Sequence, residues 1–355
     1  MRELHIAGRR IADDTPAFVV AELGTNHGGS VDQARALIAA AAEAGADAVK
    51  LQKRDNRTLF TRELYDSPYV SEHAYGATYG EHREALEFGW PEYQELQAYA
   101  ESLGLVFFAT AFDVPSADFL QALGVPCFKI ASGDLTNLLL IRHVARLGKP
   151  VILSTGGGTF EDVDAAWWAA EETAPVSPPD LVLLQCTASY PAVPEELNLR
   201  VIETYREEFP GLVIGLSDHQ DGISLAPVAY ALGARIFEKH FTLSRSWKGS
   251  DQAFSLEPEG LRRMVQALRA TRAALGDGVK RVYDSEREPI RKMAKSIVAA
   301  RPLAAGHVLE ASDLALRSPG GGLPPYEWDR LIGLRLREAL LADGLVTREV
   351  VQPWD

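Results

Sequence analysis

Polar side chains that could bind a metal stand at the ends of two apolar runs of the sequence. The run VIGLSDHQDG, residues 213–222, passes into Ser217 and His219, and the later run RIFEKHFT contains His240. Alternate residues of a strand share one face, so Ser217 and His219 point to the same side. If the two runs are neighbouring strands, His219 and His240 can hold one divalent metal, with manganese favoured and magnesium the alternative. A strand histidine is otherwise most often a hydrogen-bonded core residue.

Two lysines interrupt apolar strand-like runs. Lys50 follows the residues ADAV, and Lys129 stands between Phe128 and Ile130. An unpaired ammonium group is costly to bury, so each lysine requires a negatively charged partner. We expect that partner to be an anionic ligand, with a structural ion pair as the alternative.

A glycine-rich turn follows another apolar run in the sequence STGGGTFED. Backbone N–H groups of Gly156 to Gly158, together with the start of the next helix, can face a phosphate group. A plain connection between strand and helix explains the glycines equally well. The turn therefore supports an anion site only in combination with the lysines.

The elements that must position these residues form a repeating pattern. Eight short apolar runs alternate with helix-like segments: AFVVAEL at 17, DAVKLQK at 47, LVFFAT at 105, CFKIAS at 127, PVILST at 150, LVLLQCT at 181, LVIGLSD at 212 and RIFEKHF at 235. In the first helical segment, Ser30 suits the N-cap and Gly45 the C-terminus. The pattern predicts a (β/α)8 TIM barrel, with a doubly wound open sheet as the alternative. Each run ends in polar residues, which is where such a barrel carries its active site.

Composition narrows the classes of function. The chain has 355 residues, of which 46% are hydrophobic, and a formal net charge of −13. That charge argues against nucleic acid as a partner. No apolar stretch is long enough to span a membrane, and MRELHIAGRRIADD lacks the apolar core of a signal peptide. The two cysteines, Cys127 and Cys186, do not form a C-x-x-C motif. We therefore expect a cytoplasmic protein that is not bound to a membrane.

Three segments are expected along the chain. Residues 1–275 would form the catalytic barrel, the charged segment 276–293 a linker, and residues 294–355 a small β-rich domain. Within the barrel, residues 54–90 are much longer than a usual loop between strand and helix. This excursion is expected to be a lid or a substrate loop.

Several ordered motifs resemble the sialic acid (N-acetylneuraminate) synthase family. They are AELGTNHGGS, DAVKLQK, FKIASGDLTN, ILSTGG, CTASYP, GLSDH and EKHF, and the region SIVAARPLAAGHVLEASDLALRSPGGGL resembles the family's antifreeze-like SAF domain, a β-clip fold. The resemblance covers nearly the whole chain. It implies a transferase that condenses phosphoenolpyruvate with an N-acylated amino sugar, such as N-acetylmannosamine or a related hexosamine. The products would be a nonulosonic 2-keto-3-deoxy acid and phosphate.

The resemblance also assigns roles to individual residues. It implies phosphoenolpyruvate contacts from Lys50, Gln52, Thr110, Lys129, Ser132, Ser154 and Ser217. It places metal ligands at His219 and His240, and a catalytic carboxylate at Glu22. Amino-sugar contacts would come from Asp134, Tyr190 and Asp251, and from Arg317 of the small domain, which would complete the active site of the partner subunit in a homodimer.

Two positions depart from the family pattern in the sugar-contact region. Ala188 stands where asparagine is common, and Asp134 stands where glutamate is frequent. Ala188 lacks a hydrogen-bonding side chain and Asp134 has a shorter reach, so the acceptable amino sugar can differ.

Two other kinds of function compete with this interpretation. A metal-dependent aldolase, or another phosphoenolpyruvate-using sugar-acid synthase, would use the same barrel. A glycan- or ice-binding protein would use the small domain, but it would not need polar groups at all the strand ends. Phosphate release from phosphoenolpyruvate distinguishes these alternatives.

Overall fold

The protein consists of two compact units. The computed structural model describes residues 2–177 and 179–352. Contacts within the chain divide it into Met1–Gly276 and Asp277–Asp355. The segment expected to be a linker, 276–293, contains helix α12 (Asp284–Met293). The division into barrel, linker and small domain remains a proposal.

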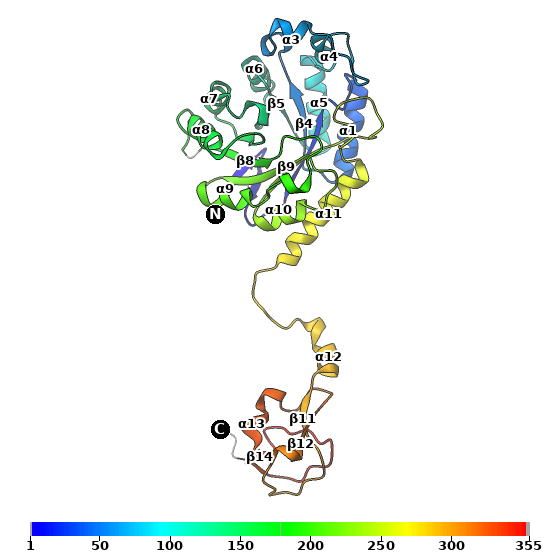
Figure 1. Cartoon of the computed structure of the whole chain (residues 1–355), viewed down its shortest axis with the longest axis vertical. Coiled ribbons are helices and arrows are strands. Elements are labelled where there is room, and N and C mark those ends of the chain that lie inside the picture. Colours follow the sequence, from blue (N-terminus) through cyan, green and yellow to red (C-terminus); the bar gives the residue numbers. More distant parts are fainter. Residues whose placement is uncertain (1, 178, 353–355) are drawn as a thin grey trace. The chain divides into compact units, whose positions relative to one another are not determined.

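The first unit is built on a closed parallel barrel (Figure 1). Its strands are β3 (Phe18–Gly24), β4 (Ala48–Lys53), β5 (Val106–Ala111), β6 (Phe128–Ile130), β7 (Val151–Ser154), β8 (Leu181–Cys186), β9 (Val213–Asp218) and β10 (Ile236–His240). They pair in sequence order, and β10 closes the barrel on β3. The predicted (β/α)8 barrel is therefore confirmed. The strands read as continuous apolar runs because they are almost entirely buried.

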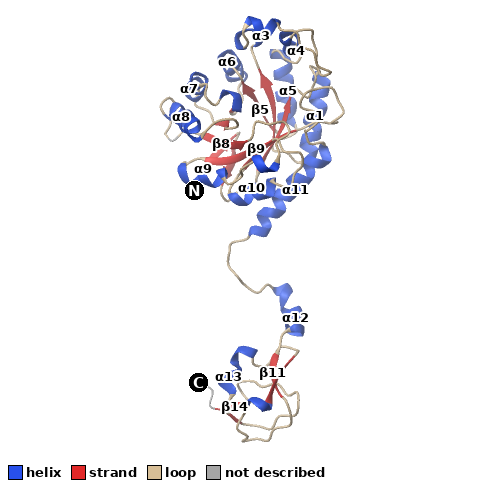
Figure 2. Cartoon of the chain, in the orientation of Figure 1, coloured by secondary structure: helices blue, strands red, loops and turns tan. Residues whose placement is uncertain are grey.

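Helices surround this barrel (Figure 2). The principal ones are α1 (Val31–Ala44), α5 (Trp90–Ser102), α6 (Val114–Leu123), α7 (Leu138–Arg146), α8 (Phe160–Glu171), α9 (Val201–Glu208), α10 (Ala226–Leu232) and α11 (Pro258–Leu275). Helix α1 begins and ends as predicted: Ser30 accepts a hydrogen bond from the N–H of Gln33, and Gly45 ends the helix with a φ of 91°. No helix in the described part of the chain is both long and apolar enough to cross a bilayer.

Shorter elements decorate the barrel. They are the hairpin β1 (Glu3–Ile6) and β2 (Arg9–Ala12), the helices α2 (Asn56–Leu59), α3 (Arg62–Asp66) and α4 (Tyr79–Glu84), and the 3-10 turns η1 (Ser132–Asp134) and η2 (Pro194–Glu196). The excursion after β4 contains α2, α3 and α4. It contacts the loop after β10, because the Tyr75 hydroxyl donates a hydrogen bond to the Lys248 carbonyl at 2.8 Å.

The second unit has a small core of its own. Its strands β11 (Ser296–Ala299) and β12 (Leu314–Arg317) are antiparallel, as are β13 (Arg335–Leu336) and β14 (Val351–Gln352). The turns η3 (Ala311–Asp313) and η4 (Pro325–Glu327) and the helix α13 (Trp328–Leu331) complete it. Buried residues such as Ile297, Leu309 and Leu331 form the core.

A buried ion pair joins the last two strands of the barrel. Lys239 Nζ lies 2.8 Å from Asp218 Oδ2, and the two side chains are 2% and 5% exposed. Successive side chains of a strand point to opposite faces. Ser217, His219 and His240 therefore line the cavity of the barrel, and Asp218 and Lys239 lie on the other face.

We expect Lys239→Met to lower the free energy of unfolding of the barrel by about 3 kcal/mol, because it leaves a buried carboxylate without its partner. The double variant Lys239→Met/Asp218→Asn should recover much of this loss, since the charge disappears while an oxygen remains to accept the Gln220 N–H. Urea unfolding followed by circular dichroism measures both. A double variant as unstable as the single one would contradict the explanation.

Candidate active site

A cavity of about 370 Å³ opens at the carboxyl ends of the barrel strands. It brings together most of the predicted site residues: Glu22, Lys50, Gln52, Thr110, Lys129, Ser132, Ser154, Tyr190, Ser217, His219, His240 and Asp251. Ala188 also lies on its wall. Residues from all parts of the barrel sequence therefore converge on one volume that is large enough for small-molecule substrates.

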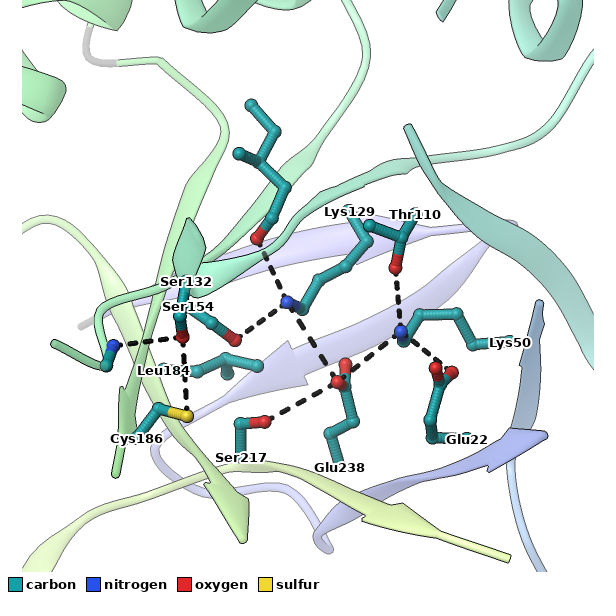
Figure 3. A network of polar contacts seen from close by, with 12 residues as sticks. Glu22, Lys50, Thr110, Lys129, Ser132, Ser154, Leu184, Cys186, Ser217 and Glu238 are labelled. Atoms are coloured by element: carbon teal, nitrogen blue, oxygen red, sulfur yellow. Dashed lines mark hydrogen bonds and ion pairs between the residues drawn. The ribbon is translucent and has the colours of Figure 1, made fainter. Parts of the chain in front are cut away.

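Lys50 is held between two carboxylates on neighbouring strands (Figure 3). Its Nζ lies 2.7 Å from Glu22 Oε2 and 3.5 Å from Glu238 Oε1, and it donates a hydrogen bond to Thr110 Oγ1 at 2.8 Å. Burial lowers the pKa of the ammonium group, but the carboxylates outweigh this effect, and the pKa lies above its ordinary value. Lys50 is therefore positively charged at neutral pH.

Lys129 lies near the same Glu238 carboxylate as Lys50 (Figure 3). We call Lys50, Lys129, Glu22 and Glu238 the lysine cluster. Its Nζ donates hydrogen bonds to Ser154 Oγ at 2.7 Å and to the Ile130 carbonyl at 3.0 Å. Glu238 Oε1 is 3.9 Å away. Burial lowers the pKa of Lys129, and Glu238 opposes this only in part.

Each lysine has a carboxylate of the protein itself close by. Glu22 and Glu238 supply two carboxylates for the two ammonium groups. Burial raises the pKa of Glu22, and Lys50 offsets this only in part. For Glu238, Lys129 and Lys50 outweigh burial and hold the pKa below its ordinary value. The alternative of a structural ion pair thus describes the site as it stands, and ligand contact remains a prediction.

His219 and His240 lie close together, because they stand at the ends of the neighbouring strands β9 and β10. Their ring centroids are 5.5 Å apart. His219 Nδ1 donates a hydrogen bond to the Thr187 carbonyl at 2.8 Å, which leaves Nε2 with its lone pair. His240 Nδ1 is buried without a hydrogen-bond partner and lies 3.8 Å from Asp251 Oδ2.

This pair meets the chemical requirements of a metal site with two protein ligands. Burial lowers the pKa of His240, which keeps the imidazole neutral, as a metal ligand must be. The bond from His219 to a backbone carbonyl fixes its ring in the manner usual for ligating histidines. No cluster of three or more histidine, cysteine or carboxylate ligands occurs among the described residues. A metal held by two imidazoles has open positions that substrate or water oxygens can occupy.

The glycine-rich turn supports the site indirectly. The N–H of Gly156 donates to Ser132 Oγ at 3.0 Å, and the N–H of Gly158 points to the Thr155 carbonyl. These two donors are therefore not directed at an oxyanion. A Cβ at Gly156 would lie 2.9 Å from Ser132 Oγ, so glycine is needed for the close approach that positions this hydroxyl.

Two predicted sugar contacts do not line the cavity. Asp134 is half-buried and accepts a hydrogen bond from Asn137 at 3.0 Å. Arg317 belongs to the second unit, at the end of β12, where it pairs with Asp343 at 3.0 Å. Their proposed roles remain untested.

Three cavity residues carry charge but were given no role from the sequence. Glu238 stands two residues before His240 on the same strand face, and this spacing was the available signal. Arg54 and Arg83 also line the cavity, from the excursion after β4. Loop arginines are common at protein surfaces, so sequence alone did not distinguish these two.

Together, the fold and the cavity define a (β/α)8-barrel protein with a charged ligand site at the carboxyl ends of its strands. The chain belongs to the NeuB family, whose profile matches residues 37–280. A SAF domain matches residues 294–349. The resemblance to sialic acid synthases with a C-terminal SAF domain is confirmed.

Named relatives cover nearly the whole chain. Human N-acetylneuraminate-9-phosphate synthase is 38% identical over 345 residues, 97% of this chain and 95% of the relative. The N,N'-diacetyllegionaminic acid synthase of Legionella pneumophila is 38% identical over 338 residues, 94% of each chain. The crystal structure of an N-acetylneuraminic acid synthetase from Leptospira borgpetersenii, in complex with citrate, superimposes with a TM-score of 0.71 at 32% identity and covers 81% of this chain and 95% of that one.

Proposed function

We propose that this protein is a transferase that condenses phosphoenolpyruvate with an N-acylated amino sugar, giving a nonulosonic 2-keto-3-deoxy acid and phosphate. One observation carries the proposal. A single cavity holds the buried lysine cluster beside a histidine pair, and these features suit an anionic substrate next to a carbonyl substrate.

The phosphoenolpyruvate would lie over the lysine cluster. Lys50 and Lys129 supply positive charge. The hydroxyl groups of Thr110 and Ser154 accept from these ammonium groups, which leaves the hydroxyl protons for a ligand oxygen, and the Ser217 hydroxyl lies beside Glu238 on the same wall. The Gly156 N–H holds the hydroxyl of Ser132 on the same wall, and Gln52 lies beside Glu22. Such fixed donors bind carboxylate and phosphate oxygens without reorganising during the reaction.

The amino sugar would enter beside the histidines. His219 and His240 would hold the divalent metal, proposed as Mn²⁺ with Mg²⁺ as the alternative, which when bound supplies a Lewis acid for the sugar carbonyl. Tyr190 lies against both rings, with centroid distances of 4.1 Å to His219 and 6.0 Å to His240. Asp251 completes this wall and would bind sugar hydroxyl groups.

The reaction balances without a covalent enzyme intermediate. C3 of phosphoenolpyruvate forms a bond to the aldehyde carbon of the open-chain sugar, whose oxygen takes up a proton. The oxygen of a water molecule then adds to C2 and loses a proton, which replaces the proton taken up by the sugar oxygen. The C2–O bond to phosphate breaks, the second water proton leaves with the phosphate, and the keto group remains at C2. Glu22 is the proposed proton carrier, because burial raises its pKa toward the range useful for general acid–base catalysis.

The named relatives differ in whether their product carries a phosphate group. The names of the relatives include a synthase whose product is a 9-phosphate and one whose named product carries no phosphate. Ala188 on the cavity wall supports a sugar whose hydroxyl or acylamino pattern differs from that of the usual substrate.

The proposed partner is a second copy of the chain. Arg317 would reach the active site of the partner subunit, and each site would then need two chains. Cytoplasmic location is part of the proposal too, and it is supported by Cys127 and Cys186, which are both free and buried.

Phosphate release from phosphoenolpyruvate tests the proposed function. Purified protein with Mn²⁺ is incubated with a panel of free and phosphorylated N-acyl amino sugars, and both phosphate and the keto acid are measured. We expect release only when a sugar aldehyde is present, with one keto acid formed for each phosphate. Release without any sugar, or no release with the whole panel, would overturn the proposal.

A further inference from the structure

Two arginines define a second basic region of the cavity wall. Arg54 directly follows β4, and Arg83 lies in α4 of the excursion. Both line the cavity, yet the phosphoenolpyruvate site proposed above uses neither. We call Arg54 and Arg83 the arginine pair.

Arg54 has a buried donor that nothing in the structure satisfies. The residue is only 8% exposed, and its guanidinium carbon lies 3.8 Å from the centroid of the Phe112 ring. Nη2 donates to Gln52 Oε1 at 2.6 Å, whereas Nη1 has no hydrogen-bond partner. Its one ion-pair contact is to Glu87 at 3.8 Å. A buried, unsatisfied guanidinium donor on a cavity wall indicates a ligand acceptor.

Arg83 adds a charge that no carboxylate balances. Its Nε and Nη2 both point to the Tyr79 hydroxyl, at 3.1 and 2.9 Å. Among the described residues, no acidic side chain lies within ion-pair distance of Arg83. Glu87 is shared with Lys53, which is nearer to it at 3.1 Å than Arg54 is. Of the residues that the structure describes, Glu87 is the one carboxylate within ion-pair distance of the arginine pair and Lys53, which together carry three positive charges.

The charges of the pair act on one another. After burial, the positive charge of Arg83 is the next largest effect that lowers the pKa of Arg54. Burial, followed by Arg83 and Lys248, likewise lowers the pKa of His82 to about 4, so that histidine is neutral. Asp251 on the same cavity wall lies 3.8 Å from His240, and its negative charge, like that of Glu87, raises the pKa of Arg54 in part. A dianion bound between the two arginines would remove their repulsion.

This region is separate from the lysine cluster. A chain of contacts leads from Arg54 through Gln52 and Glu22 to Lys50: Gln52 accepts from Arg54 and donates to Glu22 Oε1 at 2.8 Å, and Glu22 Oε2 pairs with Lys50. Along these contacts, two side chains lie between the Arg54 guanidinium and Lys50. One phosphoenolpyruvate molecule bound at the lysines leaves the arginine pair for the second substrate.

We propose that the amino sugar carries a phosphate monoester, which Arg54 and Arg83 bind; this inference rests on the proposed function. A monoester has a charge of about −1.5 to −2 at pH 7 and three acceptor oxygens, and guanidinium groups match such oxygens in pairs. Phosphoenolpyruvate supplies three carbons, so a 6-phosphate on a six-carbon sugar would become a 9-phosphate in the product. The ester lies at the end of the open-chain sugar remote from the reacting aldehyde.

The test compares N-acetylmannosamine with its 6-phosphate, using initial rates of phosphate release from phosphoenolpyruvate. We expect kcat/KM to be about a hundredfold higher for the phosphorylated sugar, because charge-assisted bonds to two arginines are lost with the free sugar. Arg83→Gln should lower kcat/KM for the phosphorylated sugar by about tenfold or more and leave that for the free sugar within about twofold. Arg54→Gln should lower the value for the phosphorylated sugar at least as much and that for the free sugar by less, because it also releases the Gln52 side chain. Arg57→Gln, at an exposed arginine of the same excursion outside the cavity, is the matched control.

Each result separates the inference from the proposed function. Turnover of the free sugar at the same efficiency as its 6-phosphate would overturn the inference and leave the proposed function standing. The same holds if the arginine variants raise the KM of phosphoenolpyruvate instead of that of the sugar, because the pair would then bind the other substrate. If neither sugar is turned over and the full panel shows turnover of unphosphorylated sugars alone, the inference is overturned; failure of the whole panel overturns both. If Arg54→Gln does not fold, the half-buried Arg83 provides the variant that decides.

Discussion

His240→Ala is expected to lower kcat by about a thousandfold while the barrel stays folded. The imidazole lies at the end of β10, and its Nδ1 makes no hydrogen bond, so alanine breaks no hydrogen bond at that atom. What the substitution removes is one of two proposed metal ligands. His219→Ala should have a similar effect on turnover, but it also removes the bond to the Thr187 carbonyl.

Metal binding provides a measurement that does not depend on turnover. Protein freed of metal by chelation is titrated with Mn²⁺, and free Mn²⁺ is followed by electron paramagnetic resonance. The wild type should bind one ion per chain, and His240→Ala should bind it at least about tenfold more weakly. His143→Ala, at a histidine that pairs with Asp118 away from the cavity, is the control. Full activity in metal-free protein, or unchanged Mn²⁺ affinity in His240→Ala, would contradict the assignment.

The barrel could be predicted because the burial of its strands and the ends of its helices are visible in the order of apolar and capping residues along the sequence. Strands covered on both faces must be apolar along their whole length, and caps such as Ser30 and Gly45 mark where helices begin and end. The position of the site followed from the same rule, since the polar residues at strand ends had to converge. For this reason the sequence alone predicts that His219 and His240 lie together.

The electrostatic details of the site were not predictable in the same way. A buried lysine indicates a partner, but whether the partner is a ligand or Glu22 depends on the register between β3 and β4, which periodicity does not specify. Arg54 and Arg83 are a harder case. They are 29 positions apart in a loop without regular spacing, and only the folded excursion brings them to one wall. Residues that act from long loops therefore have to be found in the structure.

Two inactive variants, Arg317→Ala and His240→Ala, are expected to recover activity when they are mixed, because Arg317 is proposed to act in the partner subunit. The arginine is 55% exposed, and its partner Asp343 is 59% exposed. Exposed ion pairs of this kind contribute little to stability, so Arg317 can exchange Asp343 for sugar or acyl oxygens. If each small domain serves the partner's barrel, Arg317→Ala and His240→Ala disable different parts of a shared site.

Mixing the two variants under conditions of subunit exchange should restore about a quarter of wild-type activity, because half of the dimers are mixed and each of these has one complete site. That site combines His240 from the Arg317→Ala chain with Arg317 from the His240→Ala chain. Mixing Arg317→Ala with the double variant His240→Ala/Arg317→Ala is the matched control, since no site then has both residues. Mass spectrometry of intact dimers verifies the exchange. If mixed dimers form and the first mixture stays as inactive as the control, Arg317 does not act across the dimer, because action within one chain predicts no recovery in either mixture.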